Sequence, residues 1–270
     1  MHGGLQMRAR LILASLLMAA LLCTTAMAHM PGAAPAPDVE LRPIQIYDGN
    51  KLVEISIDDL AAYHGKCTGQ GPSKCPCVVI GYRAAEAGIN ALYGDEIPER
   101  SDIMIISAYP SMGSLQDFQY ITGTGPEMDY KETGTFNLIL ADGTEITDFS
   151  NKNIKKISGN IGPDDCKFTI IRESTGKSID LALNGDIFPS DYFDLRKKVK
   201  ITKNATPEES QKFLDEYVAL RDAALTKPAW ELFKGIDEPP EEEPDVFGGG
   251  IFLSIFILFV AAGIIIIRRK

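Results

Sequence analysis

The chain has 270 residues, of which 45% are hydrophobic and 24% are charged, and its formal net charge at pH 7 is −10. This length is enough for one domain with a substantial hydrophobic core. The negative charge argues against a nucleic-acid-binding protein, because such a protein needs basic patches that neutralise phosphates.

Residues 1–28 have the pattern of a secretory signal peptide. Arg8 and Arg10 form a basic start, and an apolar run follows at residues 11–22. Residues 26–28, Ala-Met-Ala, supply the small side chains that a signal peptidase needs around its cleavage site. The sequence therefore predicts an exported protein, and an uncleaved N-terminal anchor is the alternative.

A leader of small residues and proline spans residues 29–39, and residues 40–235 are predicted to form one globular domain. Apolar residues at helical spacing predict helices over residues 57–63, 78–93 and 114–122. The best-marked helix comes last in the domain. It begins after the cap Thr206, with Pro207 in its first turn and Glu209 completing a capping box, and it ends at Pro228.

Short β-like runs lie between the second of these helices and the last. They span residues 103–107, 136–140, 145–149, 167–172 and 178–183. Asp142 and Gly143 separate the second run from the third, which predicts a hairpin. Strands mixed with helices predict an α+β fold, in which helices pack on a mixed or antiparallel sheet.

The end of the chain has the pattern of a stalk and a membrane anchor. Residues 236–247 are acidic and proline-rich, which keeps a segment extended and solvated. Residues 248–267 are uncharged and almost wholly apolar, and a helix of this length spans a bilayer core of about 30 Å. The basic residues 268–270 should stay cytoplasmic, so the pattern predicts a single-pass cell-membrane protein with its N-terminal domain outside (type I). A buried core helix and a sorting signal removed after export are the alternatives.

The segment from Tyr63 to Arg83 has the strongest chemical signal. It contains His64 and three cysteines, at positions 67, 75 and 77. Glycine and proline between Cys67 and Cys75 allow the chain to bend and bring the four side chains together. Imidazole and thiolate ligands suit zinc, so His64, Cys67, Cys75 and Cys77 are the predicted metal ligands.

The cysteines leave two other interpretations open. Cys67, Cys75, Cys77 and Cys166 would remain after signal cleavage, and an even number in an exported domain favours disulfides. Cys75 and Cys77 are expected to be poorly placed to bridge each other, because a single residue separates them. A reactive thiol with His64 as its base is the other interpretation.

Three pieces of this segment resemble the FmdE family, a type of domain associated with formylmethanofuran dehydrogenase. They are His64-Gly65, Cys75-Pro76 and the run Gly-Tyr-Arg-Ala at residues 81–84, and the usual motif reads His-Gly-His-x-Cys-Pro-Gly-x-x-x-Gly-x-Arg. Residues 115–123, which end in Ile-Thr-Gly, and residues 231–233 are also similar to that family.

The resemblance covers about residues 55–235 and implies metal binding, of zinc in particular, in one-carbon metabolism of archaea and anaerobes. It implies that His64 and Cys75 match a metal-site histidine and cysteine, and it implies no particular reaction. This sequence departs from the family pattern at the second histidine, which has no clear counterpart. A later Asp-x-Cys-x-x-Asp segment reads Ser-Met-Gly-Ser-Leu-Gln here, at residues 111–116. Cys67 and Cys77 are additions that could replace the lost ligand.

Together these patterns predict an extracytoplasmic, membrane-anchored, FmdE-like domain that binds zinc. It would be accessory to anaerobic one-carbon or respiratory metabolism, without catalytic activity of its own. The C-terminal helix would bind the membrane, and a membrane protein or an exported redox or metal protein would be the partner. The alternatives are a thiol-based redox enzyme and a degenerate, disulfide-stabilised scaffold.

Overall fold

The computed structural model describes residues 30–126 and 128–240. A six-stranded sheet has the order β5-β4-β3-β6-β7-β8. Only β3 and β4 run parallel among these pairs, so the sheet is mixed. The strands are β3 (Ile103–Ser107), β4 (Thr135–Ile139), β5 (Glu145–Ile146), β6 (Lys167–Arg172), β7 (Lys177–Leu183) and β8 (Phe233–Lys234).

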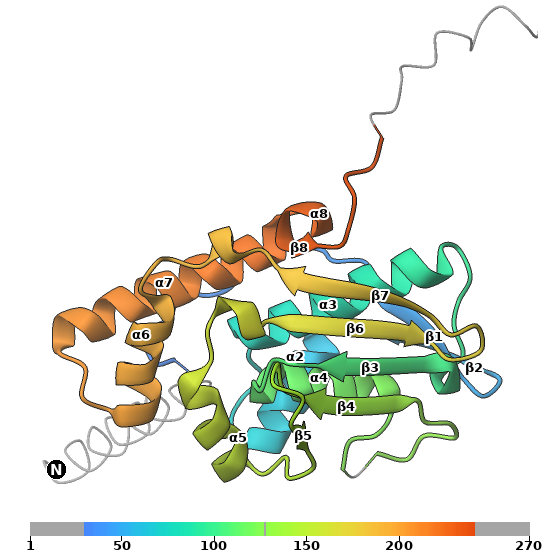
Figure 1. Cartoon of the computed structure of the whole chain (residues 1–270), viewed down its shortest axis with the longest axis horizontal. Coiled ribbons are helices and arrows are strands. Elements are labelled where there is room, and N and C mark those ends of the chain that lie inside the picture. Colours follow the sequence, from blue (N-terminus) through green and yellow to red (C-terminus); the bar gives the residue numbers. More distant parts are fainter. Residues whose placement is uncertain (1–29, 127, 241–270) are drawn as a thin grey trace, which may run out of the picture. The chain divides into compact units, whose positions relative to one another are not determined.

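Helices cover one face of the sheet and gather at one of its ends (Figure 1). The elements that pack behind the sheet are α2 (Ile57–Thr68), α3 (Pro76–Tyr93) and α4 (Met112–Thr122). Those near one end are α5 (Asn151–Ile157), α6 (Tyr192–Arg196), the π-helical continuation of α6 (Lys197–Thr202) and α7 (Pro207–Thr226). A separate hairpin, β1 (Ile44–Asp48) and β2 (Lys51–Ile55), precedes α2, and α8 (Ala229–Leu232) precedes β8.

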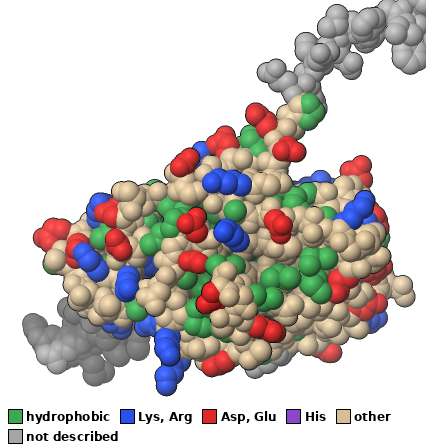
Figure 2. Space-filling model, in the orientation of Figure 1, with side chains coloured by type: hydrophobic (Ala, Val, Ile, Leu, Met, Phe, Trp, Pro, Cys, Tyr) green, Lys and Arg blue, Asp and Glu red, His purple; other side chains and the backbone are tan. Residues whose placement is uncertain are grey.

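The two faces of the sheet differ in burial. Side chains such as Ile105, Phe168 and Ile170 point toward the helices and are almost fully buried. The opposite face is only partly buried and includes Ile106 and Ile171. Figure 2 shows hydrophobic side chains over these strands, among scattered acidic and basic side chains. The core therefore lies between the sheet and the layer of α2, α3 and α4.

Helix α3 is the central element of that layer, since it contacts α2, α4, α7, β6 and β7. Two glycines allow these close approaches. A Cβ at Gly88 would lie 2.6 Å from Ile170 of β6, and a Cβ at Gly81 would lie 2.8 Å from the Ser114 Cα of α4. Small residues at these two positions let α3 pack closely against both the sheet and α4.

Most of the predicted elements are present, and the α+β class is confirmed. The strand at 103–107, the β-like runs at 167–172 and 178–183, the β4–β5 hairpin and the capping box at Thr206 are all confirmed. The run predicted over 145–149 was too long, because β5 covers only Glu145–Ile146. The predicted helix at 57–63 was too short, because α2 continues to Thr68 and ends at the left-handed Gly69. The β1–β2 hairpin, α5 and α6 were not predicted.

The predictions for the two chain ends fall largely on residues that the structure does not describe. The signal peptide at 1–28, the membrane helix at 248–267 and the basic tail at 268–270 lie outside the described residues, as does most of the stalk at 236–247. Within residues 30–126 and 128–240, no helix is long and apolar enough to span a bilayer.

Gly81→Ala should destabilise the protein by about 1–3 kcal/mol, because its Cβ would collide with the backbone of α4. In a helix without this contact, the same change stabilises by up to about 1 kcal/mol. Urea denaturation measures the difference, and Gly185→Ala is the control because no atom lies within 4 Å of its added Cβ. A Gly81→Ala protein at least as stable as the unmodified one would contradict this account of the α3–α4 contact.

Candidate functional site

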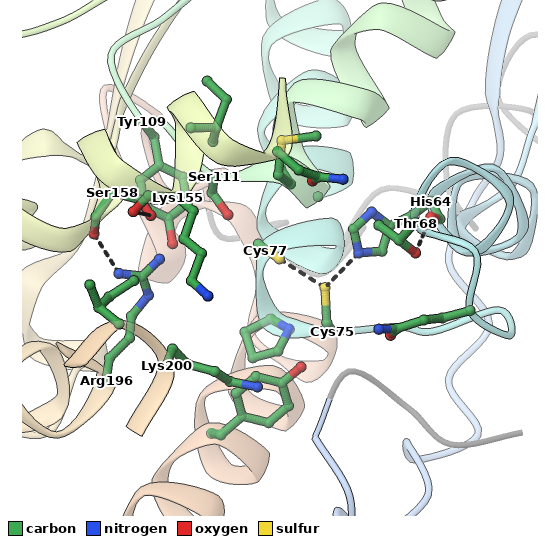
Figure 3. Close-up of a pocket in the computed structure, with 18 of the residues that line it drawn as sticks. His64, Thr68, Cys75, Cys77, Tyr109, Ser111, Lys155, Ser158, Arg196 and Lys200 are labelled. Carbon is green, nitrogen blue, oxygen red and sulfur yellow. Dashed lines mark hydrogen bonds between the residues drawn. The ribbon is translucent and has the colours of Figure 1, made fainter. Parts of the chain in front are cut away.

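A cavity of about 430 Å³ lies where α2, α3, α4, α5, α6 and α7 meet (Figure 3). One side is formed by His64, Cys75 and Cys77, and the other by Lys155, Arg196 and Lys200. The remaining lining residues are mostly aromatic, aliphatic or uncharged polar: Thr68, Gln70, Pro76, Tyr109, Ser111, Met112, Gly113, Asn151, Ile154, Ser158, Tyr192, Ile201, Phe213 and Tyr217.

The two cysteine sulfurs meet at the start of α3. Cys75 is the extended N-cap residue, with φ −70° and ψ 159°, and Pro76 begins the helix. This turn directs both side chains to one side, where Cys75 Sγ lies 2.8 Å from Cys77 Sγ. Cys75 and Cys77 were expected to be poorly placed to bridge each other, yet their sulfurs are in contact, because the backbone changes direction at Pro76.

The two sulfurs differ in their protonation. The hydrogen bond from Cys75 lowers the pKa of Cys77 to about 5, against the opposing effect of burial, and His64, Ser111 and the Gly113 N–H lower it further. Burial and the contact with Cys77 raise the pKa of Cys75 well above its usual range. At neutral pH, the pair therefore holds one proton, which Cys75 donates to the Cys77 thiolate.

His64 lies in the middle of α2 and is only 2% exposed. Its ring is oriented by a hydrogen bond between Nδ1 and Gln116 Oε1 of α4. Because an amide oxygen only accepts, Nδ1 donates the proton of this hydrogen bond, and Nε2 is the ring nitrogen that faces Cys75. Cys75 Sγ lies 3.8 Å from that Nε2.

Gly113 of α4 explains how Cys77 fits. A Cβ at this position would lie 2.6 Å from Cys77 Sγ, so a side chain on residue 113 and the Cys77 sulfur cannot occupy this space together. In the pattern that the sequence resembles, position 113 is a cysteine and position 116 is a carboxylate. Here Cys77 Sγ from α3 lies beside the glycine at position 113, and Gln116 accepts a hydrogen bond from His64.

Cys67 is placed differently from the other three predicted ligands. It lies near the end of α2 and lines a separate cavity with Tyr63, Lys66 and Gln116. Cys166 is buried next to the start of β6 and does not line this cavity, and burial raises its pKa. All four cysteines of the described chain are free thiols.

The imidazole of His64 and the sulfurs of Cys75 and Cys77 are donor types that zinc binds, but their positions match the geometry of a zinc site only in part. Tetrahedral zinc, with Zn–S of about 2.3 Å and Zn–N of about 2.0 Å, places neighbouring ligand atoms about 3.5–3.8 Å apart. The Cys75–His64 separation is close to this value, whereas the two sulfurs would have to move apart by about 1 Å to fit that geometry. Accordingly, no group of three or more His, Cys, Asp or Glu side chains in residues 30–126 and 128–240 is already arranged to hold a metal ion. The four-ligand set remains a prediction.

The sequence did not single out the three cations or Gln116. Lys155 lies on α5, while Arg196 and Lys200 lie on α6 and its π-helical continuation. Burial lowers the pKa of Lys200; Cys77 and Cys75 oppose this shift, and Arg196 and Lys155 add to it. Elements that are distant in sequence bring these residues together, so no local motif could reveal them. Gln116 did have a signal, since it stands where the resembling pattern has a carboxylate.

Comparison with known proteins identifies the domain. A family model described as "FmdE, Molybdenum formylmethanofuran dehydrogenase operon" matches residues 73–234. The match includes Cys75, Cys77 and the three cations, and it begins after His64 and Cys67. No curated protein and no solved structure gives a match to this chain. Because the family model matches more than half of the 270 residues, the chain belongs to the FmdE family.

Proposed function

We propose that the protein is an exported, membrane-anchored FmdE-family domain that binds a zinc ion through His64, Cys75 and Cys77. The observation that carries this proposal is the convergence of one imidazole nitrogen and two sulfurs on one side of a cavity. Gln116 fixes the ring so that Nε2 faces Cys75. Such a second partner on the far ring nitrogen is the usual support of a metal-ligating histidine.

Three protein ligands would leave the fourth position of a tetrahedral ion open toward the cavity. Cys67 was predicted as a fourth ligand, but it lines another cavity, which favours the three-ligand arrangement. An open position allows zinc to bind an exogenous ligand or to polarise it. The proposed role is an accessory one in anaerobic one-carbon or respiratory metabolism, with an exported redox or metal protein as partner. The export signal and the C-terminal anchor of this proposal rest on the patterns of residues 1–28 and 248–270.

A second function, thiol redox chemistry, is favoured by the 2.8 Å separation of Cys75 and Cys77. The Cys77 thiolate would attack a disulfide of an oxidised partner protein and release one partner thiolate. Cys75 would then attack the mixed disulfide, which joins the two sulfurs and releases the second partner thiolate, so that two electrons and the pair's one proton pass to the partner. The Cys77 thiolate would be the attacking group, because the thiolate is the reactive form of cysteine. Zinc bound by both sulfurs would block this reaction, so metal content distinguishes the two functions.

The first prediction concerns metal affinity. The purified full-length protein should bind about one zinc ion, and His64→Gln or Cys77→Ser should abolish tight binding. Gln116→Leu should weaken binding by about 10–100-fold, because it removes the hydrogen bond that orients the His64 ring. Metal analysis and competition with a chromophoric chelator give these values.

Cys67→Ser is the matched control for Cys77→Ser and should leave zinc affinity unchanged. Loss of zinc from Cys67→Ser would contradict the three-ligand arrangement. Absence of zinc from the unmodified protein, with Cys75 and Cys77 joined in a disulfide, would overturn metal binding in favour of the redox function.

The second prediction concerns the reactivity of Cys77 in metal-free protein. Its pKa of about 5 means that the thiolate is almost fully present above about pH 6 and is lost as the pH falls through 5. Alkylation of Cys77 by iodoacetamide should therefore be nearly constant from about pH 6 to 8, as followed by peptide mass spectrometry. In the unfolded protein, the rate should rise about tenfold per pH unit over this range.

Cys75→Ala removes the largest cause of the low pKa, so it should move the alkylation profile of Cys77 to higher pH. Cys166→Ala is the control, because Cys166 lies outside this cavity. A native profile as steep as that of the unfolded protein would show that the Cys75–Cys77 hydrogen bond does not stabilise the thiolate.

A further inference from the structure

The cavity has a charge opposite to that of the whole protein. The chain carries −10, yet Lys155, Arg196 and Lys200 line the cavity, and its lining in the described part of the chain includes no aspartate or glutamate. Figure 3 shows Lys155 and Lys200 reaching toward the space beside Cys75 and Cys77. These three cations outnumber the single Cys77 thiolate in the lining, and an excess of positive charge in a pocket concentrates negatively charged ligands.

The three cations are held close together by the fold. The Arg196 guanidinium donates a hydrogen bond from Nη1 to the Ser158 carbonyl at 2.6 Å, which fixes its position. Lys200 follows Arg196 at i,i+4 on one continuous helical segment, and its ammonium lies 5.8 Å from the centre of the Tyr217 ring. Like charges at this spacing repel each other, so a bound anion would offset that repulsion.

Aromatic and aliphatic side chains line much of the rest of the cavity, beside the polar Thr68, Gln70, Ser111, Asn151 and Ser158. Tyr192, Phe213 and Tyr217 form a packed group of rings, and Ile154 and Ile201 also line the space. A volume of about 430 Å³ is in the range of sites for small organic molecules. The lining therefore suits a molecule that joins an acidic group to an apolar body.

We propose that this cavity binds a small organic anion, with its acidic group between Lys155, Arg196 and Lys200 and its apolar body against the aromatic rings. A guanidinium and two ammonium groups can bind a carboxylate or a phosphate ester through charge-assisted hydrogen bonds. The inference deepens the proposed function and rests on it in one respect: the bound molecule would lie next to the open side of the His64–Cys75–Cys77 group. Binding of the acidic group itself depends only on the three cations.

Calorimetric titration of the full-length protein with four probes tests the proposal. Phenylacetate and phenyl phosphate carry an acid on an apolar ring, phenylacetamide is uncharged, and inorganic phosphate has no apolar body. At least one of the two aromatic anions should bind at least about tenfold more tightly than both phenylacetamide and inorganic phosphate, and the tighter of the two identifies the acid.

Lys155→Gln and Lys200→Gln should each weaken binding of that anion by about tenfold. Lys156→Gln is the matched control: it removes the same charge from the neighbouring position on α5, but Lys156 does not line the cavity. The affinity of the Lys156→Gln variant for the aromatic anion should equal that of the unmodified protein.

The proposal is overturned if neither aromatic anion binds, or if phenylacetamide or inorganic phosphate binds as tightly as the aromatic anions. It is also overturned if Lys155→Gln and Lys156→Gln bind the aromatic anion with equal affinity. Zinc analysis of the same samples separates this proposal from the previous one. Anion binding in a protein without zinc refutes the metal function alone. Zinc without anion binding refutes the anion site alone.

Discussion

The close approach of α3 to its neighbours is the constraint on which the site depends. The start of α3 carries both sulfurs of the cavity, and its middle carries the glycines that touch α4 and β6. With α3 held at this distance, Cys77 contacts Gly113 of α4, and Cys75 reaches His64 of α2. A larger residue at Gly81 would move the two cysteines relative to α4, so core packing and site geometry are coupled.

At the pair Cys77 and Gly113, two departures from the family pattern meet in the folded protein. The cysteine of the resembling pattern is absent from α4, but a sulfur from α3 occupies the space beside that position. Gln116 in turn accepts the hydrogen bond of His64 that a carboxylate could accept. The departures at positions 77 and 113 therefore lie in contact with each other, and the departure at position 116 lies in contact with His64.

The two sides of the cavity suit different parts of one ligand. Cysteine sulfur is a soft metal donor and histidine nitrogen is a common ligand of transition metals, whereas Lys155, Arg196 and Lys200 are cationic groups that attract an acid. These groups share one space with aromatic rings. Such a combination fits a domain that holds a small anion next to a metal ion or a thiol pair, and it fits poorly with a purely structural disulfide scaffold.

The sequence by itself determined the local features: the helices and strands of the α+β domain, the capping box at Thr206 and the concentration of His64 and cysteines near the start of α3. These depend on periodicity, caps and turn residues, which act over a few positions. It also indicated the family through motifs in this segment, and the match to residues 73–234 confirms it. Only the tertiary structure decided that Cys67 lies apart, that Cys77 fills the space beside position 113 and that three cations face the sulfurs. Each of these three results depends on how side chains from different helices pack against one another. Packing between segments that are distant in the sequence leaves no periodic pattern in the chain, so the sequence alone could not show it.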